Sequence, residues 1–138
     1  MKKIVLLCFL LLLTFGNTAS AANWQYVMTA KNGDTLFFDS DTLKVNEYKY
    51  LDVWTKCVLS PKANSKVAYQ IYHVELSQTP RCMKFLSFYS YSANNKFIGQ
   101  HTIPSSWDEI IPGTYSEAFY RKIVQYYKDK VASDAQQL

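Results

Sequence analysis

The chain has 138 residues, a formal net charge of +4 and 49% hydrophobic residues. This length suits one domain with a buried core. The 15 basic residues are scattered along the sequence, so the charge pattern does not favour a nucleic-acid-binding protein. The four glycines occur singly, which excludes a glycine-rich phosphate-binding loop.

The N-terminal segment has the pattern of a secretory signal peptide. Lys2-Lys3 precedes an unbroken apolar run from Ile4 to Leu13. Ala19-Ser20-Ala21 fits the pattern of small residues at a signal-peptide cleavage site. The apolar run is too short to span a bilayer. We therefore predict a signal peptide over residues 1–21 and export to the periplasm or the cell surface.

The segment that remains after cleavage, residues 22–138, is predicted to form a single domain. Without Lys2 and Lys3 it carries 13 basic residues against 11 acidic ones, so its charge is close to neutral. None of its stretches is long and apolar enough for a transmembrane helix, so no transmembrane segment is expected after cleavage. Its last residues, 133–138, are polar and are predicted to be a disordered tail.

Six segments alternate apolar and polar residues, or are dense in aromatic residues, as half-buried strands do. Asn32-Gly33 and Asn94-Asn95 suit hairpin turns, and a two-residue turn is expected at Asn94-Asn95. The short connections predict that sequential strands pair antiparallel. The predicted strands are Trp24–Met28, Thr35–Phe38, Tyr48–Leu59, Val67–Leu76, Phe85–Ser92 and Lys96–Ile103.

A helix is predicted from Thr114 to about Lys130. Thr114 and Glu117 have the spacing of a capping box. Tyr115, Phe119 and Ile123 recur at helical spacing and form one apolar stripe. The predicted fold is therefore α+β: an antiparallel meander sheet of about six strands with one C-terminal helix packed on one face.

The two cysteines of the mature chain are Cys57 and Cys82. In an exported protein such a pair indicates a disulfide, which we predict here. Two buried free thiols are the structural alternative. A nucleophile pair of one cysteine with His73 is the catalytic alternative, although no family-specific local pattern accompanies it.

The other residues with chemical potential have structural explanations. His73 and His101 lie in strand patterns and are too far apart in sequence for a favourable metal site. Asp34, Asp39 and Asp41 lack the spacing of a calcium loop and suit turns. We expect no catalytic residue, no cofactor and no metal, hence a protein that is not an enzyme.

One pattern in the sequence consists of Trp54 in DVWTK, the strand from Cys82 to Tyr91, and then Trp107, Ile110, Pro112, Gly113 and Thr114. With this pattern, the chain from Trp24 to about Tyr127 resembles the surface-adhesin protein E-like domain of bacterial envelope proteins. The family's hairpin has an Asp and a Gly where this chain has Ser92 and Asn95, and the family's helix carries a cysteine that is missing here.

The resemblance implies a sheet with a helix on its concave side, binding to host matrix or serum proteins, and dimerisation. The expected function is therefore that of an exported, non-enzymatic binding module of the cell envelope. A periplasmic accessory or small-ligand-binding domain is the alternative. A host protein, another envelope protein or a second copy of the chain is the expected partner, and nucleic acid is not.

Overall fold

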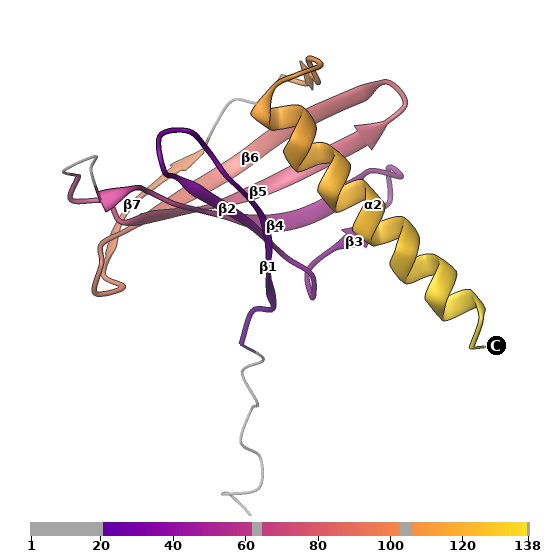
Figure 1. Ribbon diagram of the computed structural model, residues 1–138, viewed down its shortest axis with the longest axis horizontal. Helices are drawn as coiled ribbons and strands as arrows, with labels where there is room; N and C mark the ends of the chain where they lie inside the picture. Colours follow the sequence, from indigo (N-terminus) through magenta and orange to yellow (C-terminus); the bar gives the residue numbers. More distant parts are fainter. Residues whose placement is uncertain (1–20, 62–64, 103–105, 138) are drawn as a thin grey trace, which may run out of the picture.

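The computed structural model describes residues 21–61, 65–102 and 106–137 (Figure 1). The predicted signal peptide thus lies outside the described residues, except for Ala21. The elements are β1 (Trp24–Thr29), β2 (Thr35–Asp39), β3 (Lys44–Val45), β4 (Leu51–Val58), β5 (Tyr69–Gln78), β6 (Arg81–Tyr91), β7 (Phe97–Thr102), β8 (Asp108–Glu109) and α2 (Tyr115–Ala135). The predicted α+β class, with an antiparallel sheet and one C-terminal helix, is confirmed.

The sheet is a meander in the order β1-β2-β4-β5-β6-β7. Two short strands complete it. β3 pairs with β4 beyond the end of β2, and β8 pairs with β6 beyond the end of β7. The sequence pattern predicts neither β3 nor β8, because two residues are too few to show alternation. The two longest strands, β5 and β6, pair with each other along most of their length.

Alternation along β4 decides which side of the sheet is covered. Leu51, Val53 and Thr55 are buried, whereas Asp52, Trp54 and the other intervening residues are only half-buried. Leu51 and Val53 join the hydrophobic core, together with Val74, Leu76 and Met83 from the neighbouring strands. One face of the sheet therefore packs on the core and the other does not.

Helix α2 covers the core side of the sheet and crosses the strands obliquely (Figure 1). Phe119, Tyr120, Ile123 and Val124 are its buried residues. The hydroxyl of Tyr120 donates to the Ser77 carbonyl oxygen at 3.0 Å, so this buried polar atom is satisfied. The predicted stripe is confirmed at Phe119 and Ile123, but Tyr115 is 47% exposed.

The helix begins where the capping pattern predicts. Thr114 Oγ1 accepts the N–H of Glu117 at 3.3 Å. The Glu117 carboxylate accepts the N–H of Gly113, one residue before the usual capping-box partner, at 2.8 Å. Gly113 has φ +80°, a left-handed conformation that costs glycine little.

The C-terminal end of the helix differs from the prediction. The helix continues to Ala135, so residues 133–135 are helical and the prediction of a disordered tail is wrong for them. Its last two turns are exposed and extend beyond the sheet (Figure 1). No apolar stripe continues into these residues, so the sequence pattern does not predict a helix there. Helix propensity and continuity with the packed turns stabilise this part of the helix.

Three hairpins use the same device, a three-residue loop whose last residue has positive φ. Gly33 has φ 92°, Lys49 has φ 67° and Asn95 has φ 61°. In each loop the residue at this position donates its N–H to the carbonyl three residues earlier: Ala30, Asn46 and Ser92. The predicted Asn-Gly turn is confirmed, whereas the turn at Asn94-Asn95 has three residues and not two.

Lys49 is the least suitable of these residues, because a left-handed backbone costs a residue with a Cβ about 1–2 kcal/mol. Replacing Lys49 by glycine should therefore raise the free energy of unfolding by about 0.5–1 kcal/mol, measured by urea denaturation. The matched control is Lys44→Gly in strand β3, which should lower stability. If Lys49→Gly also lowers stability, the left-handed conformation at Lys49 is contradicted.

Candidate functional site

The face of the sheet opposite α2, which we call the open face, is dense in aromatic side chains. Within the described residues, the one helix lies on the other side. Residues that pair in register place their side chains on the same side of a sheet, so Lys56, Ile71 and Tyr89 lie together on this face. By the same register and by ring contacts, the face carries Trp24, Tyr26, Phe37, Tyr50, Trp54, Tyr69, Tyr89, Tyr91 and Phe97.

Trp54 lies at the centre of the open face. Its ring stacks on the imidazole of His73 across the strand pair, with centroids 4.6 Å apart and planes 11° from parallel. Tyr89 packs against the same indole at 5.8 Å. His73 Nε2 lies 3.0 Å from both carboxylate oxygens of Asp52, which fixes the imidazole at its edge. The sequence predicts that these residues lie on strands, but only the register between the strands shows that they are neighbours.

Lys56 adds a positive charge next to this centre. Its Nζ atom lies 4.5 Å from the ring centroid of Tyr69 and 5.5 Å from that of Trp24. These distances are within the range of cation–π attraction. Tyr69 in turn stacks on Tyr91 with centroids 5.0 Å apart. The aromatic rings therefore hold one another and the ammonium group in place, so the surface is largely pre-formed.

Trp107 extends the open face at the end nearest β8. Its ring contacts Tyr50 at 4.6 Å, and the Nζ atom of Lys84 lies 5.7 Å above it. Ile110, by contrast, is buried in the core, and its N–H donates to the Arg81 carbonyl at 3.1 Å. Among the residues that carry the family resemblance, Trp54 and Trp107 thus lie on the open face, whereas Ile110 supports the fold.

The catalytic alternative pairs His73 with one of the two cysteines. Among the described residues, His73 hydrogen-bonds to Asp52 on the open face, whereas Cys57 lines a cavity on the other side of the sheet. His101 stacks on Phe88 at 4.6 Å and is remote from this centre. Asp39 Oδ1 accepts the N–H of Asp41, and Asn32 Oδ1 accepts that of Asp34, as expected for turns, while the Asp39 and Asp34 carboxylates also bind more distant backbone N–H groups, those of Asn23 and Ser60.

The predicted disulfide between Cys57 and Cys82 is wrong, because both thiols are free. Cys57 pairs with Gln70 of β5, and Cys82 pairs with Ser77 of the same strand. The steps from Gln70 to Ser77 span about 23 Å of extended chain. A disulfide requires Cα atoms within about 7 Å, so the strand register keeps these two cysteines apart.

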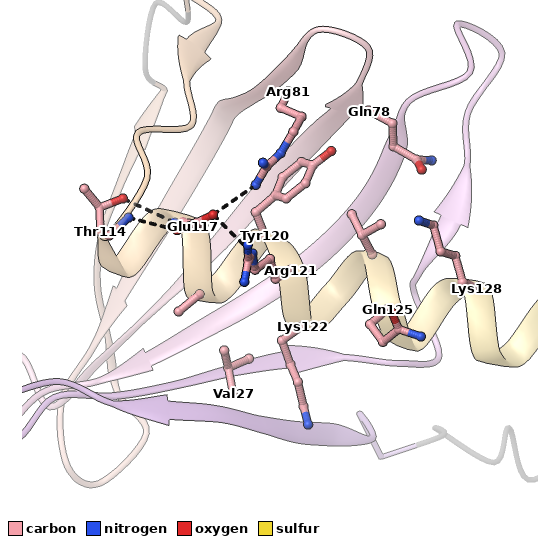
Figure 2. A pocket seen from close by; sticks show the side chains of 13 residues that line it. Val27, Gln78, Arg81, Thr114, Glu117, Tyr120, Arg121, Lys122, Gln125 and Lys128 are labelled. Atoms are coloured by element: carbon pink, nitrogen blue, oxygen red, sulfur yellow. Dashed lines mark hydrogen bonds and ion pairs between the residues drawn. The ribbon is translucent and has the colours of Figure 1, made fainter.

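An open groove of about 920 Å³ runs beside α2 (Figure 2). Its charged centre is Glu117, whose carboxylate lies 3.1 Å from Arg121 Nε and 3.4 Å from Arg81. The Gly113 N–H, and then these two cations, lower the pKa of Glu117. This cluster joins the first turn of α2 to the β5–β6 turn, and its two guanidinium groups share one carboxylate.

On the core side of the sheet, two titratable side chains lie close to one another. Burial, with a smaller contribution from Asp34, raises the pKa of the Cys57 thiol. Burial also raises the pKa of Tyr72 to about 12, with further contributions from Cys57 and Asp34. The Tyr72 hydroxyl donates to Gln70 Oε1 at 2.5 Å, which requires the neutral phenol.

The raised pKa of Tyr72 predicts a loss of stability at high pH. The neutral Tyr72 phenol contributes fully to the free energy of unfolding below about pH 10, the pKa of free tyrosine. This contribution is lost as the pH rises towards 12, the raised pKa of Tyr72 in the folded chain. Urea unfolding between pH 9 and pH 12 should show the native chain losing stability relative to Tyr72→Phe. Parallel pH profiles of the two proteins would show that Tyr72 titrates normally.

Among the described helices, none is long and apolar enough to cross a bilayer. Comparisons with protein-family models, with curated proteins and with solved structures return no match for this chain.

Proposed function

We propose that this chain is an exported, non-enzymatic binding protein of the bacterial envelope that contacts a protein partner through the open face. The observation that supports the proposal is the uncovered aromatic centre formed by Trp54, His73, Tyr89 and Lys56. Aromatic side chains are enriched in protein interfaces, and an aromatic surface rimmed by charged groups is typical of a protein-binding site. The resemblance to protein E-like adhesins supports host matrix or serum proteins as the partner class.

The edges of the open face support the same function. Tyr26, on the first strand, is 55% exposed, and Phe97, on the last strand of the meander, is 52% exposed. Strand β7 has no charged Lys, Arg, Asp or Glu side chain between Phe97 and Thr102, so charge does not protect this edge. A strand from a partner, or from a second copy of the chain, therefore has an edge on which to pair.

The test is binding of the purified mature protein to immobilised matrix and serum glycoproteins. A Tyr26→Ser/Phe97→Ser variant removes two exposed rings and should retain the fold. We expect saturable binding by the native protein and at least about tenfold weaker binding by this variant. The matched control is Val131→Ser on the exposed end of α2, which should bind like the native protein. Equal binding by all three proteins would remove the open face from the proposal.

A further inference from the structure

A cavity of about 230 Å³ lies on the core side of the sheet, beneath the first turns of α2. Its apolar walls are Leu36, Met83, Phe85 and Phe119. Leu36 and Phe85 belong to the core side, yet they stay half-buried because the helix begins before it covers them completely. The cavity is therefore an opening into the hydrophobic core.

Tyr115 lies at the helix end of this cavity and is one of the residues that line it. The N–H of Lys31, in the β1–β2 loop, donates to the Tyr115 hydroxyl at 3.1 Å. This hydrogen bond joins the hairpin loop to the start of α2. Tyr115 remains 47% exposed, so the cavity opens to solvent beside its ring, which gives a small molecule access.

The volume indicates the size of the occupant. An apolar cavity of about 150 Å³ in another protein core takes up benzene. The present cavity is larger, so it can take a molecule with one or two fused rings. A long acyl chain or a peptide segment exceeds this volume, because drug-sized ligands occupy pockets of about 300–1,000 Å³.

The polar groups of the cavity indicate the charge of the occupant. Thr55, Cys57 and Tyr72 line it. The Thr55 hydroxyl donates to the Tyr72 carbonyl at 3.5 Å, and the Tyr72 hydroxyl donates to Gln70. Lys56 also lines the cavity, but its Nζ atom lies on the open face, 4.5 Å from the ring centroid of Tyr69. A charged ligand would therefore be buried among mainly apolar side chains without a partner of opposite charge, so a neutral molecule fits best.

We propose that this cavity is a second binding site, which takes a small neutral molecule of one or two apolar rings between α2 and the sheet. The site is on the opposite side of the sheet from the open face, so it does not depend on the proposed protein-binding function. Cys57 and Tyr72 form its polar wall, and Phe119 forms the wall on the helix.

The first test uses indole as the neutral probe and indole-3-carboxylate as its anionic counterpart. The chain has three methionines, of which Met83 lines the cavity. In protein with ¹³C-methyl methionine, indole should shift the Met83 signal saturably, and the carboxylate should bind at least about tenfold more weakly. No saturable shift at millimolar indole, or equal binding of the two probes, would overturn the proposal.

The second test uses the two thiols of the reduced protein. Indole should slow alkylation of Cys57, which lines the cavity, and leave the rate at Cys82 unchanged as the internal reference. Equal slowing at both thiols, or slowing at neither, would contradict the site.

Two variants separate this site from the open face. Cys57→Leu fills the cavity and should abolish the indole shift, whereas Tyr26→Ser/Phe97→Ser should leave it unchanged. If Cys57→Leu does not fold, Ser116→Leu fills the cavity from the helix side instead. Indole binding that survives a folded, filled variant would place the probe elsewhere and refute the inference.

Discussion

Replacing Phe119 by alanine is expected to lower the free energy of unfolding by about 3–5 kcal/mol, as measured by urea denaturation. Phe119 is 7% exposed and lies in the core cluster with Leu51, Val53 and Ile123. The substitution removes a buried ring and leaves its volume empty. It also enlarges the existing cavity, which reduces the chance that the neighbouring side chains close the gap.

The matched control for Phe119→Ala is Val131→Ala on the same helix. Val131 is 47% exposed and lies beyond the sheet, so its truncation should change stability by less than about 0.5 kcal/mol. A loss below about 1 kcal/mol for Phe119→Ala would contradict the packing of α2 on the sheet. Alanine has a higher helix propensity than either residue, so equal losses for both variants would show that burial against the sheet does not determine the cost.

Replacing Trp54 by alanine is expected to weaken binding to the partner by about 30-fold or more, which corresponds to about 2 kcal/mol. The substitution removes the ring on which His73 stacks and which Tyr89 contacts, so it disrupts the centre of the open face. Surface plasmon resonance with the glycoprotein identified by the immobilised panel measures this change.

Trp54→Phe is the conservative counterpart, since it keeps a ring in contact with His73. It should retain most of the affinity, and both variants should show the far-ultraviolet circular dichroism of the native protein. If Trp54→Ala is folded and binds with native affinity, Trp54 is not part of the interface.

The fold was largely predictable because its signals are local. Buried and half-buried residues alternate along β4 as the sequence alternates, and Asn32-Gly33 forms the predicted hairpin turn. Thr114 caps the helix at the predicted position. These features depend on a few neighbouring residues, whose propensities and spacings agree with one another.

Features that depend on register were not predictable. Two cysteines in an exported chain favour a disulfide, but strand pairing places Cys57 and Cys82 far apart along β5. The same register brings Asp52, Trp54 and His73 together, although sequence alternation gives no indication of which residues face one another across strands. The two-residue repeat of a strand determines which face of the sheet each side chain lies on. Which side chains contact one another across strands depends on how the strands pair.

The cavity beneath α2 could not be predicted from the sequence either. Tyr115 belongs to the apolar stripe, and its spacing indicates a buried residue. In the structure it is half-exposed, because the helix starts near the edge of the core and its first turn overhangs the opening. The crossing position of a helix on a sheet depends on tertiary packing, which helical periodicity does not encode.

In the proposed function, the open face, and not the helix side, binds the partner. Site-specific photocrosslinking on intact cells, with and without added serum, distinguishes the two sides. The photoreactive residue is placed at Ile71, which lies in the middle strand of the open face, or at Lys130 on the exposed end of α2. We expect a discrete protein adduct from Ile71 and none from Lys130. An adduct from Lys130 alone, or none from either position, would contradict it.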